Sequence, residues 1–261
     1  LVLQEEKAPV PSSDDHTVVN VATNSRDIGY IVSRSGAWDV SGCYFSRMDY
    51  EGTVMWGPKR ILDYGISGDN NAFIYNDKLE KYQLIRAGYG GFTIVSIPDT
   101  ESEAVTSETM NYPSAYPSFS EAVIINSCFY DNTTTVDPMI VVAFEADNSH
   151  TYICKYPPMA PYSPSQATDL GQSSSYSPSS NSSIAYLPED QASLIPAAYF
   201  VAADVHDGTK NVIRVSKIRA TDLFLMGTYE IPVSVQYSTP SVVIDDINRM
   251  VVVAYDIPAS Y

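Results

Sequence analysis

Short runs of β-branched and aromatic residues alternate along the whole chain with clusters of Gly, Pro, Asn and Asp. Two clear runs are Gly29–Ser33 and Met250–Tyr255. Runs of this length, bounded by turn-forming residues, are typical of β-strands. No segment of a dozen residues combines helical spacing of apolar positions with a capped start. The pattern therefore predicts an all-β protein.

A loose repeat recurs five times, because the most apolar runs begin at about 52- to 59-residue intervals near Tyr30, Tyr82, Ile140, Tyr199 and Val251. In the first four copies a second run follows, at 43–47, 92–96, 151–155 and 212–216. One such unit cannot bury both of its faces, so the repeats must pack on one another. A sandwich would not produce near-equal repeats. We therefore predict a β-propeller of about five blades, with roughly 50–60 residues per repeat.

The repeat pattern also suggests the domain boundaries. An acidic, extended arm is expected over residues 1–16 and a single propeller domain over 17–261, with repeats near 17–63, 64–110, 111–171, 184–235 and 236–261. The most apolar strand of each repeat is expected nearest the axis, where both of its faces are covered.

A Ser/Pro/Tyr-rich loop, residues 157–183, interrupts the series. Ser occupies eight of the eleven positions from Ser173 to Ser183, which favours an extended, solvated backbone. This composition resembles the O-glycosylated, hydroxyproline-bearing stretches of extracellular matrix and cell-wall glycoproteins. A plain flexible loop explains it equally well.

The last repeat contains only about two strands, so the predicted ring is incomplete. Three explanations are open: the natural chain is longer, the repeat count is wrong, or a neighbouring molecule donates the missing edge. For the third explanation, the apolar start of the chain, Leu1, Val2 and Leu3, is the candidate for strand exchange.

Composition narrows the range of partners. The 261 residues include 31 acidic and 15 basic side chains, giving a net charge of −16, and 44% are hydrophobic. The chain is too apolar to be disordered. Its negative charge opposes binding to nucleic acid or to anionic lipid. Membrane insertion is not expected, because the apolar runs are much shorter than a membrane span.

A secreted, extracellular location is expected from the abundance of Ser, Thr, Tyr, Asn and Asp and the scarcity of Lys. The chain opens without an initiator Met or a signal pattern, as a mature product or an excised fragment would. Asn132 and Asn181 begin N-glycosylation sequons. Cys43, Cys128 and Cys154 lack the spacing of a zinc or redox site. A disulfide between Cys128 and Cys154 is one possibility, and the other is that all three are small apolar strand residues.

One stretch, 41–56, carries a family resemblance. It has a strand, an Asp-containing turn and a second strand with Trp, and it contains Ser46, Asp49, Gly52 and Trp56. In this order it resembles secreted β-propellers of the sialidase-like and related repeat families, whose Asp box reads S-x-D-x-G-x-x-W. The spacing here differs, so the strict motif is absent. The resemblance implies a propeller fold and not an activity.

No catalytic pattern emerges from the remaining residues. His16, His150 and His206 are expected on the surface, and no G-x-S-x-G or H-E-x-x-H occurs. Acidic residues are too many for the sequence to identify a pair, and the arginines are expected to cap strand ends or pair with carboxylates. No cofactor is implied. Calcium is the most plausible metal, at the turn 204–208, although an Asp-Gly hairpin turn explains that segment better.

Two functions fit these observations. The first is a secreted, glycosylated, non-catalytic structural protein that assembles with copies of itself through propeller edges into a fibre, surface layer or matrix. The alternative is a carbohydrate-binding or carbohydrate-cleaving propeller, a lectin or glycosidase, which would use the many Tyr and carboxylate side chains. The incomplete last repeat favours the first.

Overall fold

The computed structural model describes most of the chain as antiparallel β-strands. The described residues are 16–34, 42–63, 71–88, 91–98, 100, 103–113, 124–131, 138–146, 149–172, 182–190, 194–206, 209–234, 240–245, 247–248 and 250–255. They form 18 strands and no helix, so the prediction of an all-β protein is confirmed. This part of the chain therefore offers no helical segment that could span a membrane.

Four sheets have four strands each, joined in sequence order as meanders. The first contains β1 (His16–Thr23), β2 (Ile28–Arg34), β3 (Gly42–Met48) and β4 (Val54–Leu62). The second contains β5 (Asn71–Asn76), β6 (Lys81–Gly88), β7 (Gly91–Ile97) and β8 (Thr106–Asn111). The third contains β9 (Ile124–Asp131), β10 (Met139–Glu145), β11 (His150–Tyr156) and β12 (Gln166–Gln172). The fourth contains β13 (Ser182–Leu187), β14 (Ala198–His206), β15 (Asn211–Arg219) and β16 (Leu225–Pro232).

A fifth sheet has two described strands, β17 (Pro240–Asp245) and β18 (Met250–Tyr255). This agrees with the two strands expected in the last repeat. The run 43–47 lies in β3, and the corresponding runs of the next three repeats lie in β7, β11 and β15.

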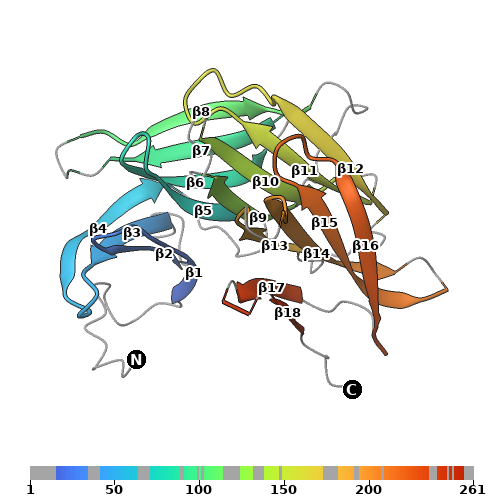
Figure 1. Ribbon diagram of the computed structural model, residues 1–261. Helices are drawn as coiled ribbons and strands as arrows, with labels where there is room; N and C mark the ends of the chain where they lie inside the picture. Colours follow the sequence, from blue (N-terminus) through green and yellow to red (C-terminus); the bar gives the residue numbers. More distant parts are fainter. Residues whose placement is uncertain are drawn as a thin grey trace.

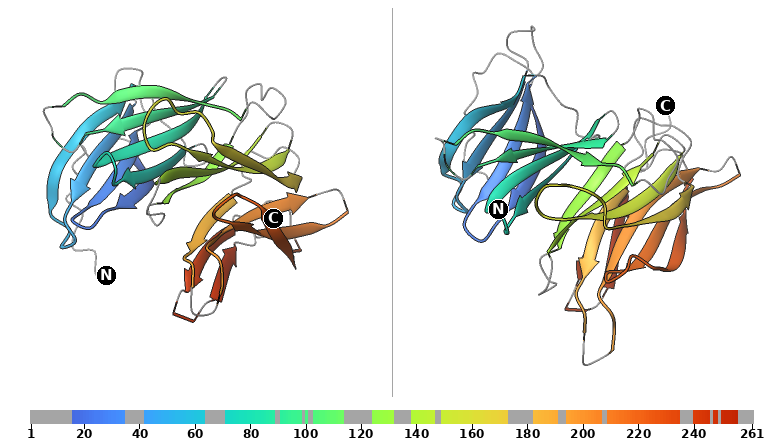
Figure 2. Two further views of the ribbon diagram at one scale, coloured as in Figure 1. Left: turned by 45° about the horizontal axis from the view of Figure 1, so that its top comes forward. Right: turned by 90° about the horizontal axis from the view of Figure 1, so that it is seen from above.

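The five sheets follow one another along an open arc (Figure 1). Figure 2 shows the first sheet at one end of the series and the fourth and fifth sheets at the other. The first strands of successive sheets contact one another: β1 contacts β5, β5 contacts β9, β9 contacts β13 and β13 contacts β17. The most apolar strands were expected in this position, but they are the second strands of their sheets. In the second, third and fourth sheets these second strands are buried on both faces, whereas β18 of the fifth sheet is exposed.

Each seam, the face-to-face contact between two successive sheets, is filled by one apolar cluster. The second seam is aromatic: Phe92 of β7 packs edge-on against Phe144 of β10, with ring centroids 5.1 Å apart. Second strands supply the most deeply buried positions, and Tyr82, Ile140 and Tyr199 are fully buried. Burial of this kind, at about 25 cal/mol per Å² of apolar surface, is the main favourable term in folding.

The hairpin between β3 and β4 contains the stretch that carries the family resemblance. The Asp49 carboxylate accepts a hydrogen bond from the Thr53 backbone N–H at 2.7 Å, which closes the turn. Trp56 packs edge-on against Phe45, with ring centroids 5.1 Å apart. The Asp and the Trp therefore stabilise a hairpin and its packing.

Gly29 provides a test of the first seam. A β-carbon at this position of β2 would overlap the ring of Tyr82 from the next sheet. We expect Gly29→Ala to lower the free energy of unfolding by about 1–3 kcal/mol, the usual cost of overpacking a core. Chemical denaturation measures this change. Gly227→Ala on β16 is the control, because no atom lies within 4 Å of the added carbon; an equal loss in both variants would contradict the prediction.

Candidate functional site

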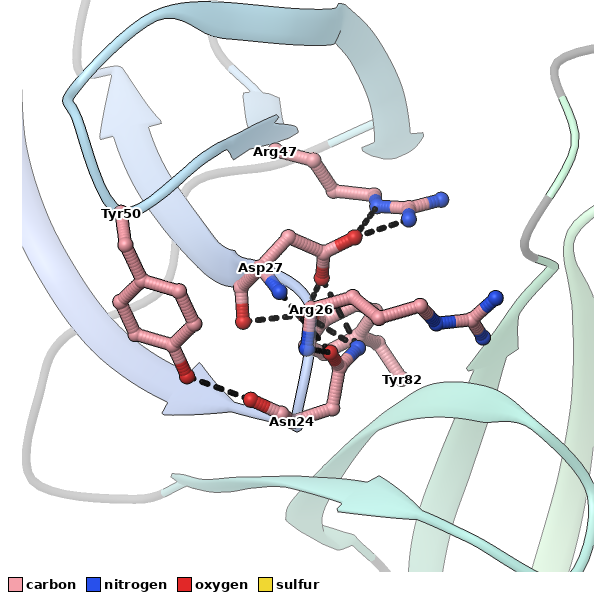
Figure 3. Close-up of polar contacts among 6 residues, drawn as sticks. All are labelled: Asn24, Arg26, Asp27, Arg47, Tyr50 and Tyr82. Atoms are coloured by element: carbon pink, nitrogen blue, oxygen red, sulfur yellow. Dashed lines mark hydrogen bonds and ion pairs between the residues drawn. The ribbon is translucent and has the colours of Figure 1, made fainter.

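Two features are candidates for function: buried polar clusters at the seams, and a strand at the end of the series that pairs with only one other described strand. The first polar cluster centres on Asp27, in the turn between β1 and β2, and is shown in Figure 3. Arg47 of β3 donates to one carboxylate oxygen through both Nε, at 3.0 Å, and Nη2. The Tyr82 hydroxyl, from β6 of the next sheet, donates to the other oxygen. Asn24 Nδ2 also donates to that oxygen, at 2.8 Å.

Hydrogen bonds between residues close in the sequence determine the shape of this turn. The Asn24 side-chain oxygen accepts hydrogen bonds from the backbone N–H groups of Arg26, at 2.7 Å, and Asp27, at 2.9 Å. Asn is favoured in turns because its short side chain can bond the backbone two or three residues ahead. Tyr50, from the β3–β4 turn, donates its hydroxyl to the Asn24 carbonyl. The result is a carboxylate held in a fixed direction, toward the second sheet.

Asp27 is ionised in this environment although it is fully buried. Burial alone would raise the pKa of its carboxyl group, but hydrogen bonds from Arg47, Tyr82 and Asn24 and the charge of Arg47 hold the pKa below its ordinary value. The pKa of Tyr82 is raised by burial and by the neighbouring carboxylate. Tyr82 therefore stays protonated and acts as a donor across the seam.

A second cluster of the same design lies at the third seam. Asp131, at the end of β9, accepts a hydrogen bond from the hydroxyl of Tyr199 on β14 of the next sheet. Lys155 of β11 is the buried cation beside this cluster; its Nζ donates to the Ala220 carbonyl and lies 5.8 Å from the centre of the Tyr199 ring. Burial lowers the pKa of Lys155, and the charges of Asp131 and Asp222 offset part of this effect. Both cations lie on third strands, where Arg47 pairs with Gly29 and Lys155 with Val141.

The second seam has a neutral version of this arrangement. Asn76 at the end of β5 donates to the Gln83 side-chain oxygen at 2.8 Å. Gln83 Nε2 lies 3.0 Å from Ser96 Oγ and 3.3 Å from the hydroxyl of Tyr162, which comes from the third sheet. All three clusters therefore join adjacent sheets through side chains whose donors and acceptors bond one another. The three clusters therefore have a structural role, which is to hold adjacent sheets together.

The three histidines belong to three different strands, β1, β11 and β14. His150 begins β11, half exposed, with Nδ1 2.9 Å from Asp169 Oδ2. His16 begins β1 and His206 ends β14. Within the described ranges, no group of three or more His, Cys, Asp or Glu residues could hold a metal ion. Of the turn considered for calcium, Asp204 is buried on β14, whereas Asp207 and Gly208 lie outside the described residues.

Several arginines pair with carboxylates, as the sequence suggested. Besides Arg47, these are Arg60 with Asp63, Arg214 with Glu230 and Arg219 with Asp222. A recess between the third and fourth sheets, beside Arg214 and Gln172, has room for little more than one water molecule.

The predicted disulfide between Cys128 and Cys154 is not formed. Both residues pair with Val142 of β10, so a whole strand lies between them. Neighbouring strands are about 4.8 Å apart, which puts the two Cα atoms about 10 Å apart, beyond the limit of about 7 Å for a disulfide. Cys154 is a buried free cysteine, and so is Cys43. Burial raises the pKa of Cys43 to about 12, and both thiols pack as small apolar side chains.

The remaining predicted positions lie outside the described residues. These are the glycosylation sequons at Asn132 and Asn181 and the candidate exchange strand Leu1, Val2 and Leu3.

The fifth sheet is the most exposed apolar part of the described chain. On β18, Met250 is 52% exposed and Val252 is 45% exposed; Val243 of β17 is 56% exposed on the same face. The opposite face packs on the fourth sheet through Val242 and Val253. In the other four sheets, the second strand pairs with a third strand, but β18 pairs with β17 alone among the described strands. No other described strand pairs with its outer edge.

The outer strands of the other sheets differ from β18 in chemistry. Each contains charged residues, Pro, or both, which block pairing with foreign strands: Pro58, Lys59 and Arg60 on β4, Glu108 on β8, Asp169 on β12, and Glu230 and Pro232 on β16. The sequence of β18, Met-Val-Val-Val-Ala-Tyr, contains neither. Strong β-propensity without a charge is the signature of a strand that accepts a partner. This edge is the candidate functional site.

Comparison with known proteins adds no relative. No model of a known protein family matches the chain, and no curated protein matches it significantly.

The Asp27 cluster yields a pH prediction. Because the folded-state pKa of Asp27 lies below the ordinary value of 3.8, its stabilisation is complete well above pH 4 and is lost as pH falls through the folded-state pKa. We expect Asp27→Asn to cost about 3–5 kcal/mol at pH 7, as for one partner of a buried ion pair. The variant should also show a shallower loss of stability on acidification.

Denaturant titrations between pH 7 and pH 3 measure both effects. Asp63→Asn is the control, because that side chain is 92% exposed. If Asp27→Asn kept the pH dependence of the unaltered protein, Asp27 would not be the ionised partner of Arg47.

Proposed function

We propose that this chain is a secreted, glycosylated, non-catalytic structural protein that associates with copies of itself through its fifth sheet. The observation that carries the proposal is the apolar edge of β18, which no other described strand covers. An edge of this kind is an aggregation hazard unless another strand covers it. Stable association through it would give an extracellular fibre, surface layer or matrix its connecting contacts.

We further propose that the five sheets are successive blades of a β-propeller, the last one incomplete, with 1–16 as an arm and repeats near the boundaries expected from the sequence. Three observations support this. Each four-stranded sheet is a meander in chain order. First strands contact one another in series. Ser96, Lys155 and Lys217 occupy equivalent positions on the third strands, since each pairs with the residue that follows Tyr82, Ile140 or Tyr199.

The net charge of −16 sets the conditions for association. Copies of a strongly acidic protein repel one another, and salt screens this repulsion over about 10 Å at 0.1 M. The contact itself is apolar. Association should therefore strengthen as salt rises, which is the opposite of what an interface held by ion pairs would show.

Sedimentation velocity over a range of protein concentrations tests the proposal. We expect larger species at higher concentration, and Met250→Glu should weaken association at least about tenfold, because it places a charge on the apolar strand in both partners. Met55→Glu is a closely matched control, since Met55 is 57% exposed on β4. It should leave association unchanged.

A protein that stays monomeric at every concentration and salt level would overturn the proposal. If such monomers bound an oligosaccharide, the carbohydrate-binding alternative would replace it. An equal effect of the Met250 and Met55 substitutions would show association that does not involve β18.

A further inference from the structure

The chain between the third and fourth strands of a sheet contacts the preceding sheet in three cases. The first case is the described part of the connection between β7 and β8. The Glu103 backbone carbonyl accepts a hydrogen bond from Lys59 Nζ of β4 at 2.8 Å. Val105, in the same connection, packs against the cluster that fills the first seam. The second sheet therefore reaches back onto the outer strand of the first sheet.

The connection between β11 and β12 reaches back onto the second sheet in the same way. Tyr162 is only 4% exposed and belongs to the second-seam cluster. Its backbone carbonyl accepts a hydrogen bond from the N–H of Asn111, at the end of β8, at 3.1 Å. The Pro158 carbonyl accepts another from Asn76 Nδ2 at 3.0 Å. The third sheet is thus bonded to the second through this connection, and one aromatic ring lies between the two sheets.

The turn between β15 and β16 reaches back onto the third sheet. Leu223 is fully buried in the third-seam cluster, whereas the next residue, Phe224, is 59% exposed. The Leu223 carbonyl accepts a hydrogen bond from Thr168 Oγ1 of β12 at 2.7 Å. The Ala220 carbonyl accepts one from Lys155 Nζ of β11. Side chains of the third sheet therefore hold two backbone carbonyls of this turn.

The backbone of the β15–β16 turn is strained at the residue that is inserted. Leu223 has a φ of 56°, in the left-handed region that residues other than Gly rarely adopt. In the β3–β4 turn of the first sheet, the positive φ of 90° falls on Gly52, where an added β-carbon would have no atom within 4 Å. A leucine keeps such a conformation only where its surroundings compensate for the strain. Here the compensation is the contact of Leu223 with the third sheet.

We propose that these three connections are latches: each holds its own sheet closed on the preceding sheet, and each seam opens when its own latch is released. The inserted residues are Val105 at the first seam, Tyr162 at the second and Leu223 at the third. Folded proteins open locally in contiguous units, and these contacts make the single seam the unit that opens. The sheets then behave as hinged parts and not as one rigid block. Separate opening of the seams does not depend on the proposed self-association.

Two buried free cysteines report on different seams, because Cys43 belongs to the first-seam cluster and Cys154 to the second. A buried thiol reacts only when its surroundings open. In the full chain, Tyr162→Ala should raise the rate at which N-ethylmaleimide modifies Cys154 at least about tenfold relative to Cys43. Peptide mass spectrometry measures each rate. Thr168→Val, which weakens the third latch instead, is the control and should leave the ratio unchanged. An unchanged ratio in Tyr162→Ala would mean that both thiols react only through global unfolding, and the proposal would fail.

Hydrogen exchange tests the third latch with a conservative variant. Thr168→Val keeps the shape of the side chain but removes the donor to the Leu223 carbonyl. The Leu223 N–H, which bonds within the turn to the Arg219 carbonyl, should exchange at least about fivefold faster, as expected when a buried acceptor loses its donor. The Asn111 N–H, bonded at the second latch, should keep its protection.

Thr228→Val on β16 is the matched control, because that side chain is exposed, and it should change neither exchange rate. If Thr168→Val accelerated the Asn111 N–H as much as the Leu223 N–H, the sheets would open as one body and the latches would be refuted. If neither rate changed, Thr168 would not hold the turn, and the third latch would be wrong.

Discussion

A buried carboxylate needs hydrogen-bond donors, and in this protein one of them comes from the neighbouring sheet. Asp27 and Asp131 are fully buried, and each accepts a hydrogen bond from a tyrosine on the second strand of the next sheet. An unpaired carboxylate in such a place would cost several kcal/mol. Only one relative placement of the two sheets satisfies it. Apolar packing holds the sheets together, but the carboxylates determine how they align.

Exposed apolar side chains are concentrated at the end of the series, because the number of neighbouring sheets differs along it. Every internal sheet has a neighbour on both faces, so its second strand is covered on both sides and paired along both edges. The fifth sheet has one neighbour and two described strands. Its second strand has the apolar composition of the others without their cover. The residues of β18 are thus ordinary for their position in a repeat, and unusual only in their surroundings.

The sequence predicted the all-β class of fold, because alternating apolar runs and turn residues are local signals; the propeller that it also predicted stays a proposal. The sequence did not predict the Asp27 cluster, since Asp27, Arg47 and Tyr82 belong to different strands and two sheets. A signal existed: Tyr82 and Tyr199 start equivalent strands, and a polar Tyr at so apolar a position requires a buried partner. The disulfide was predicted wrongly because spacing along the chain does not reveal that β10 lies between Cys128 and Cys154.

The carboxylate clusters occur at the first and third seams, whereas the second is joined by neutral amides and aromatic rings. Each of the two pairs of sheets, β1–β8 and β9–β16, therefore contains one buried carboxylate cluster. A chain cut between β8 and β9 would leave both carboxylates fully bonded and expose mainly aromatic surface. A pair of sheets, and not the single repeat that the sequence displays, is therefore the smallest part of the described chain that keeps the Asp27 or the Asp131 cluster whole.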